Sequence, residues 1–123
     1  MIDAKTWSDA ERIIHENKIV LVGVFDSTSP MGRYISSLLD DISYYVEPAI
    51  LVVKIDVASA GKSPSLSDAS PRLRLYYRGE QIWEQIGFFF NPMSDKHAIR
   101  RGILYALRSR GLTPRSLGIS LRF

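Results

Sequence analysis

The stretch IVLVGVFDSTSPMG, residues 19–32, joins a β-branched apolar run to a polar loop and then to a proline. The run over residues 19–25 contains no charge, a pattern typical of a strand buried on both faces of a sheet. Pro30 follows the loop and suits the first turn of a helix, where its missing N–H costs nothing. We therefore predict a central strand that leads through a short loop into a helix.

Helical and extended patterns alternate on both sides of this stretch. A strand, a helix and a second strand in succession favour parallel pairing through a right-handed crossover, so the fold class is α/β. The predicted elements are, in order, a helix over residues 7–17 capped by Thr6, the strand 19–25, a helix over 30–45, a strand over 49–56, a short helix near Leu66, a hairpin of residues 72–77 and 81–86, and a helix that begins at Asn91 or Ser94 and ends near Gly111.

The composition fits one folded domain. The chain has 123 residues, of which 46% are apolar and 24% charged, and it contains no cysteine. We predict a domain over residues 1–110 and a basic, apolar C-terminal extension over residues 111–123. No apolar run approaches the roughly 20 residues of a membrane-spanning helix, and the first residues lack the layout of a secretory signal, so we expect a cytoplasmic protein without a membrane partner.

Charge is distributed unevenly along the chain. All 13 acidic residues lie at or before Asp95, and from Lys96 onward the chain has seven basic residues and no acidic one. The C-terminal part therefore carries a charge of +7 and the rest −4. Guanidinium groups pair with carboxylates and phosphates, so this part suits an acidic protein surface or a nucleic acid, although it equally suits a solvated helix face.

Several single residues match the thioredoxin-like superfamily in order and spacing. Pro30 follows the central strand, Asp56 ends the next strand, and Pro71 opens the hairpin, where thioredoxins have a cis-proline. Gly79 and Gly87 match the glycines of the hairpin turn and of the end of the last strand. The chain resembles that superfamily over about residues 2–107. The resemblance implies a central mixed β-sheet flanked by helices on both faces.

The departures from the family pattern concern its chemistry. Thr28 and Met31 stand where thioredoxins have their two cysteines, and Ser27 stands where they have a tryptophan. Gly23 aligns with their buried aspartate. Without the attacking thiolate, thiol–disulfide exchange is impossible. The chain thus resembles redox-inactive members of the superfamily, which act by holding other proteins, and we expect no enzymatic activity.

The resemblance implies a peptide-binding groove beside the former active loop. A cis X-Pro bond at Pro71 would shape this groove, Ser70 would pair with an extended peptide, and Arg72 would select acidic groups. The alternative is that the loop and the proline persist only because the fold requires them. The predicted peptide- or protein-binding residues are Ser27, Thr28, Ser29, Pro30, Met31, Ser70, Pro71 and Arg72.

Other chemistry finds little support in the sequence. The hydroxyls of Thr28 and Ser29 favour helix capping over nucleophilic attack, because a nucleophile needs a base and the two histidines lie on the first and last predicted helices. His15 and His97 form no metal-ligand pattern with a carboxylate pair. We therefore predict no catalytic residue, no metal and no cofactor.

Three successive phenylalanines, residues 88–90, follow the hairpin. They cannot all point inward from an extended segment. One or two of them are expected at the surface or beneath an additional loop, and an aromatic side chain exposed there would mark a contact site. An irregular loop that folds all three back is the alternative.

The C-terminal extension alternates apolar and polar residues from Leu117 to Phe123. This period of two predicts a strand that pairs with its own sheet, with a second copy in a homodimer, or with a partner, and we prefer docking on another chain. A basic docking surface is predicted beside it, formed by Arg100, Arg101, Arg108, Arg110 and Arg115.

These features lead to one favoured function and two alternatives. The favoured function is a non-catalytic adaptor, assembly factor or chaperone that binds another protein through an acidic or extended segment. The first alternative is a ribonucleoprotein component whose arginines contact phosphate. The second is an enzyme that holds glutathione or a similar small ligand in the proline groove.

Overall fold

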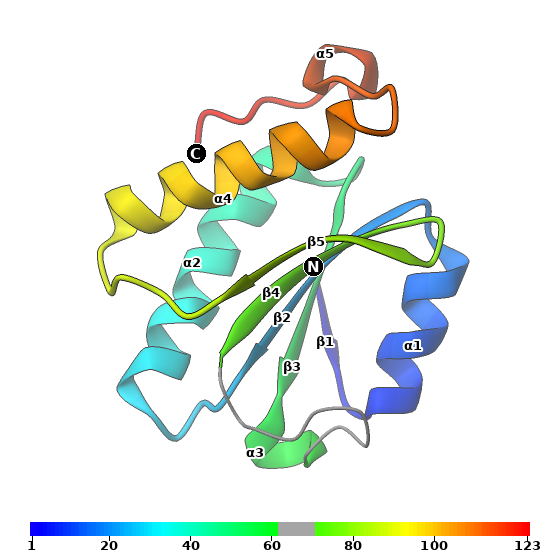
Figure 1. Ribbon diagram of the computed structural model, residues 1–123. Coiled ribbons are helices and arrows are strands. Elements are labelled where there is room, and N and C mark those ends of the chain that lie inside the picture. The colour runs from blue at the N-terminus through cyan, green and yellow to red at the C-terminus, as the bar shows by residue number, and fades with distance from the viewer. Residues whose placement is uncertain (62–70) are drawn as a thin grey trace.

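The computed structural model describes residues 1–61 and 71–123. In this part of the chain five strands and five helices follow one another (Figure 1). They are β1 (Ile2–Ala4), α1 (Trp7–Glu16), β2 (Ile19–Phe25), α2 (Pro30–Val46), β3 (Leu51–Asp56), α3 (Val57–Ala60), β4 (Arg72–Tyr77), β5 (Glu80–Ile86), α4 (Pro92–Arg108) and α5 (Pro114–Leu117). The short helix predicted near Leu66 lies outside the described residues.

The strands form one mixed sheet in the order β1-β3-β2-β4-β5. β3 runs parallel to both β1 and β2, whereas β4 runs antiparallel to β2 and β5. The predicted central strand is therefore central, and all seven of its residues are buried. β1 was not predicted, because three residues are too few to show a period.

Helices cover both faces of the sheet, as predicted (Figure 1). The side chains of successive β2 residues point to opposite faces of the sheet. Leu21 packs into the larger core with α2 and α4, and Val22 packs into the smaller core with α1. This alternation follows from the period of two in a strand. A strand that is apolar at every position therefore needs a helix layer on each side.

Short polar side chains begin the three long helices. Thr6 Oγ1 accepts from the N–H of Asp9 at 3.0 Å, as the sequence predicts. Asn91 Oδ1 accepts from the N–H of Ser94 at 3.1 Å, so Asn91, not Ser94, caps α4. Ser29 caps α2 in the same way. Each cap satisfies an N–H that has no partner within the helix. No helix in the described ranges is long and apolar enough to cross a membrane.

The strand predicted over the C-terminal extension is wrong. Thr113 and Ser116 form a capping box that starts α5, Gly118 ends it in the left-handed conformation, and residues 118–123 form no strand. Leu121 and Phe123 instead enter the larger core, where they are 9% and 8% exposed. The extension thus packs on its own chain, one of the arrangements that the pattern allowed, and its docking on another chain stays a prediction.

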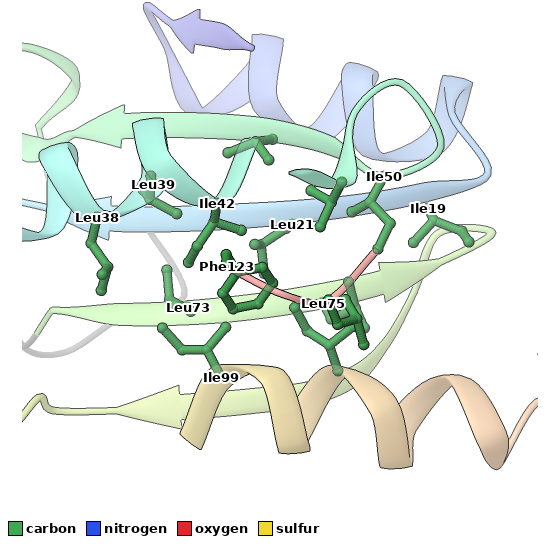
Figure 2. Packing of buried hydrophobic residues seen from close by; sticks show 14 of the residues in the cluster. Ile19, Leu21, Leu38, Leu39, Ile42, Ile50, Leu73, Leu75, Ile99 and Phe123 are labelled. Atoms are coloured by element: carbon green, nitrogen blue, oxygen red, sulfur yellow. The ribbon is translucent and has the colours of Figure 1, made fainter. Parts of the chain in front are cut away.

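Phe123 takes part in this packing. Figure 2 shows its ring among side chains of the sheet and of α2, including Leu21, Leu73 and Ile42. Arg100 on α4 donates a hydrogen bond to the carbonyl of Phe123 at 3.2 Å. The end of the extension therefore runs back along α4 (Figure 1).

Candidate functional site

Two carboxylates hold the loop between β2 and α2. Asp26 Oδ1 accepts from the N–H and the hydroxyl of Thr28, at 2.9 and 2.6 Å. Asp56, at the end of β3, accepts at Oδ1 from the N–H of Ser27 at 3.0 Å and from the N–H of Ala58 at 3.0 Å. Burial alone would raise the pKa of Asp56, but the hydrogen bonds from Ser27 and Ala58 outweigh it and hold that pKa below its ordinary value. Both carboxylates therefore anchor loops.

The loop also presses against the first turn of α2. Ser29 donates its N–H and its hydroxyl to the carbonyl of Asp26, at 3.1 and 2.9 Å, and its hydroxyl oxygen accepts from the N–H of Gly32 at 2.9 Å. A Cβ added at Gly32 would lie 1.7 Å from the carbonyl oxygen of Asp26. The loop therefore requires glycine at position 32.

The positions of the two missing cysteines differ in their surroundings. Thr28 is exposed, and its hydroxyl is bound to Asp26. Met31 is half-buried and packs against the larger core. Gly23, aligned with the buried aspartate of thioredoxins, is in close contact with Leu39: an added Cβ would lie 2.2 Å from Leu39 Cδ1. Leu39 therefore fills the space that a carboxylate would need.

Pro71 lies between the ends of two strands. The residue after it, Arg72, pairs with Val24 on β2 and with Ile86 on β5, and the carbonyl of Pro71 accepts from the N–H of Gly87 at 3.1 Å. The sheet thus places Pro71 at the edge from which the loop of residues 27–31 departs. Ser70 lies outside the described residues, and so does the peptide bond whose cis form was predicted.

Arg72 itself belongs to a charged cluster on the sheet. Its side chain is 8% exposed, and Nη1 lies 3.7 Å from Glu84 Oε2. Arg74 donates from Nε to the same oxygen at 2.6 Å. Little of the Arg72 guanidinium is therefore open to a ligand, and its selection of acidic groups stays a prediction.

An exposed apolar patch follows β5. Phe89, Phe90 and Met93 are 71%, 53% and 84% exposed, and we call these three residues the apolar patch. Phe88 is half-buried against the larger core, so two of the three phenylalanines lie at the surface, and the alternative in which the loop folds all three back is wrong. Ile86, at the end of β5, is 60% exposed.

A buried carboxylate ties this patch to α2. Asp95 is fully buried, and it accepts from the N–H of Phe89 at 3.0 Å and from the hydroxyl of Tyr34 at 2.5 Å. The ring of Phe90 stacks on that of Tyr34, with centroids 4.8 Å apart. Burial, followed by the hydrogen bond to Asp95 and the charge of Asp95, raises the pKa of Tyr34 well above its ordinary value. The phenol is therefore a permanent donor at neutral pH.

Tyr34 connects the patch to the loop, because it lies one helical turn after Met31. Pro71 contacts the segment that leads into the patch through its hydrogen bond with Gly87. We call residues Ser27–Met31, Pro71 and the apolar patch together the loop face. Of the predicted binding residues, Met31 is thus linked to the patch through Tyr34, and Pro71 through Gly87.

The predicted basic surface divides into two groups. Arg100 donates to the carbonyl of Phe123 and lies 3.2 Å from Nδ1 of His97, and Arg110 donates to Glu80 at 2.8 Å. Arg101, Arg108 and Arg115 have no carboxylate within 4.0 Å in residues 1–61 and 71–123. Among the described residues, the second group therefore has no counter-charge within 4.0 Å.

An exposed tyrosine lies between two of these arginines. The guanidinium of Arg101 lies 5.7 Å from the centre of the Tyr105 ring, and its Nη2 donates to the tyrosine oxygen at 3.4 Å. This hydrogen bond, the charge of Arg101 and the charge of Arg108 lower the pKa of Tyr105. The described residues contain no group of three or more side chains that could hold a metal ion.

Sequence comparisons find no relative: no family model and no curated protein matches the chain. Solved structures of other proteins, in contrast, superpose well on this chain. Plasmodium falciparum thioredoxin superposes with a TM-score of 0.66 at 17% identity, over 82% of this chain and 98% of that one. Fasciola hepatica thioredoxin superposes with a TM-score of 0.66 at 21% identity, over 83% of this chain and 99% of that one. A mutant of Entamoeba histolytica thioredoxin superposes with a TM-score of 0.64 at 15% identity, over 82% of this chain and 98% of that one. The chain therefore has the thioredoxin fold, without either cysteine of the redox motif.

Proposed function

We propose that this protein binds another protein through the loop face, as a non-catalytic adaptor, assembly factor or chaperone. The chain has no thiol with which to perform the exchange chemistry of thioredoxins. The carboxylates and hydroxyls of the loop are engaged in holding its shape, and they leave no nucleophile paired with a histidine. Because the polar groups of the loop are engaged in hydrogen bonds, we infer that the loop face binds a partner and does not catalyse a reaction.

The observation that carries the proposal is the exposure of Phe89, Phe90 and Met93 beside the loop. Large aromatic and methionine side chains that cluster at a surface mark protein contacts. Phe90 has a φ of +61°, a conformation that costs a bulky residue free energy. The stack on Tyr34 and the bond from Phe89 to Asp95 hold this conformation in place. The fold thus holds aromatic rings in solvent at a cost in stability.

Affinity capture from native lysate, with and without nuclease, tests the proposal. The wild-type protein is compared with a Phe89→Ser/Met93→Ser variant and with a Tyr44→Ser control, since Tyr44 is 83% exposed on α2 and outside the loop face. We expect a defined protein that survives nuclease, remains on the control and is lost from the double variant. Equal recovery on all three proteins, or loss of all specific material with nuclease, would contradict the proposal.

Nucleic-acid binding is the second candidate, favoured by Arg101 and Arg108 near the exposed ring of Tyr105 and by Arg115 on α5, which have no carboxylate within 4.0 Å in the described part of the chain. Phosphate contacts release counterions, so such binding weakens steeply with salt. A titration with single-stranded RNA at several salt concentrations measures this slope. We expect replacement of Arg101 by alanine to reduce the slope if phosphate is the ligand, and an unchanged slope would exclude this surface.

The absence of enzymatic activity and a cytoplasmic location are parts of the same proposal. A small ligand bound in the groove beside Pro71 would raise the melting temperature, and the rise would grow roughly with the logarithm of ligand concentration above the Kd. We expect no shift with glutathione. A shift that rises with glutathione concentration would favour the enzyme alternative instead.

A further inference from the structure

The solvent face of α4 continues from the apolar patch into the uncompensated arginines. Five of its exposed residues recur every four or three positions, which places these five on one side of the helix, in a sector about 120° wide. The buried residues of α4, from Asp95 to Leu107, occupy the opposite side. We call these five exposed residues the α4 strip: Met93, His97, Arg101, Tyr105 and Arg108.

The strip is positively charged along its second half. α4 contains one acidic residue, Asp95, and its side chain is fully buried beneath Tyr34 and Phe89. Arg101 and Arg108 have no carboxylate within 4.0 Å in the described part of the chain. A partner that covers the strip must therefore supply negative charge, or it would bury two cations without a counter-charge.

The order of chemistry along the strip limits the kind of partner. Apolar contacts lie at the start of α4, at Met93 and the neighbouring Phe89, and the arginines lie further along the helix. A helix rises 1.5 Å per residue, so Arg101 is about 12 Å and Arg108 about 22 Å from Met93 along the axis. An extended peptide spans 22 Å with about seven residues. One short segment can therefore reach both ends of the strip.

The separation of apolar from basic side chains along the strip favours a peptide over a nucleic acid as the ligand. In a single strand, base and phosphate alternate at every nucleotide, so its binding sites interleave aromatic and basic side chains. On the strip only Tyr105 is interleaved in this way, whereas Phe89 and Met93 lie together before the first arginine. A protein segment with distinct apolar and acidic parts fits this order better.

We propose that the partner of the loop face is a protein segment with an apolar anchor and a group of Asp or Glu residues about four to seven positions away. The anchor covers Phe89 and Met93, and the carboxylates pair with Arg101 and Arg108. Apolar burial supplies most of the affinity, while the charges fix the direction of the segment and speed its association. This inference rests on the proposed function, since it names the partner chemistry of the same face.

The test selects displayed random peptides of about 16 residues on the wild-type protein, a length that spans the strip with residues to spare. The enriched peptides are then synthesised and titrated by fluorescence anisotropy at about 50 and about 300 mM NaCl, where screening differs strongly. We expect the enriched peptides to contain apolar residues that are followed or preceded by acidic residues. We expect Arg101→Glu/Arg108→Glu to weaken binding at least about tenfold and to remove most of its salt dependence.

A matched control separates local from overall charge. Lys5→Glu/Lys18→Glu changes the net charge equally at exposed positions outside the strip, and it should bind like the wild type within about twofold. All the substituted side chains are exposed, and equal melting temperatures confirm that the variants are folded.

Each other outcome is decisive. If the Arg101→Glu/Arg108→Glu protein binds like the lysine control while Phe89→Ser/Met93→Ser abolishes binding, the inference fails and the proposed function stands. If no peptide is enriched on the wild type over the Phe89→Ser/Met93→Ser protein, the proposed function fails. Tighter binding of single-stranded polyuridylate than of any peptide, lost with the two arginines, would overturn the inference in favour of nucleic acid.

Discussion

The hydroxyl of Tyr34 on α2 donates to the buried carboxylate of Asp95 on α4, 61 positions later in the chain, at 2.5 Å. The same carboxylate receives the N–H of Phe89. One fully buried charge thus joins the helix that follows the loop to the segment that carries the exposed aromatic rings. We expect the two halves of the loop face to loosen together when this contact is removed.

Replacing Tyr34 by phenylalanine tests this contact. The substitution keeps the stack on Phe90 but leaves Asp95 with one fewer donor in a buried site, so we expect a loss of about 1 to 3 kcal/mol in the free energy of unfolding. Urea unfolding measures it. The matched control, Tyr44→Phe at an exposed position, is expected within about 0.5 kcal/mol of the wild type. Equal stability of both variants would show that the hydroxyl contributes nothing.

Replacing Asp56 by asparagine changes how stability depends on pH. The pKa of Asp56 is lowered in the folded protein from its ordinary value of 3.8. Its ionised form therefore stabilises the fold above about pH 4, and this contribution is lost as the pH falls through the lowered pKa. We expect the wild type to exceed Asp56→Asn in stability at pH 7 and the difference to shrink below pH 4. Urea unfolding at several pH values measures this, and a difference that grows toward acid would contradict the assignment.

Replacing Gly32 by alanine is expected to cost about 3 kcal/mol or more. The added methyl group would overlap the carbonyl oxygen of Asp26, which is backbone and cannot rotate away. Thermal and urea unfolding measure the loss. Ser37→Ala, an exposed position on the same helix, serves as the control and should leave stability nearly unchanged. A fully stable Gly32→Ala protein would mean that the loop adopts another path.

Truncating Phe123 to alanine is expected to destabilise the protein by about 3 kcal/mol, since the change leaves a cavity among packed side chains. Its neighbour Arg122 is exposed, and Arg122→Ala is expected to change stability by less than about 0.5 kcal/mol. Chemical denaturation compares the two variants. If both behave like the wild type, the extension does not contribute to the core.

Restoring cysteines at Thr28 and Met31 tests the alignment of the loop. The two positions flank the start of α2, where thioredoxins place their redox pair. We expect the double variant to form an intramolecular disulfide that a reductant opens, detected by thiol titration and by the mass of two hydrogens. A Thr28→Cys/Arg33→Cys protein, with a different spacing, should not form it. Free thiols in both proteins under oxidising conditions would put the loop assignment in doubt.

The sequence predicts most of the fold because its strongest patterns are local. β2 matches its predicted bounds at both ends, since an uninterrupted β-branched run lies between Lys18 and Asp26. β1 has only three residues and depends on its pairing with β3. The extension shows the period of a strand, but the Thr113 cap and Gly118 impose a helical turn, and burial of two side chains replaces strand pairing.

The candidate site could be predicted only in part. The loop residues and Pro71 follow from chain order, and the run of three phenylalanines signalled surface aromatics. Asp95 gave no such signal, because an acidic residue in the first turn of a helix usually faces solvent near the helix dipole. Its burial depends on Tyr34, which only tertiary packing brings near. The clearest missed clue was Gly32, two residues after a helix-starting proline.

The central position of β2 has a consequence for synthesis of the chain. Its seven residues are buried in the finished sheet, yet β4, one of its two neighbours, is complete only about 50 residues later. At typical elongation rates, this interval lasts about 3 to 10 seconds. During that time a nascent strand of uninterrupted apolar side chains lacks at least one of its two partners and invites pairing with other unfinished chains. Ribosome-associated factors that shield such segments should therefore bind the emerging residues 19–25.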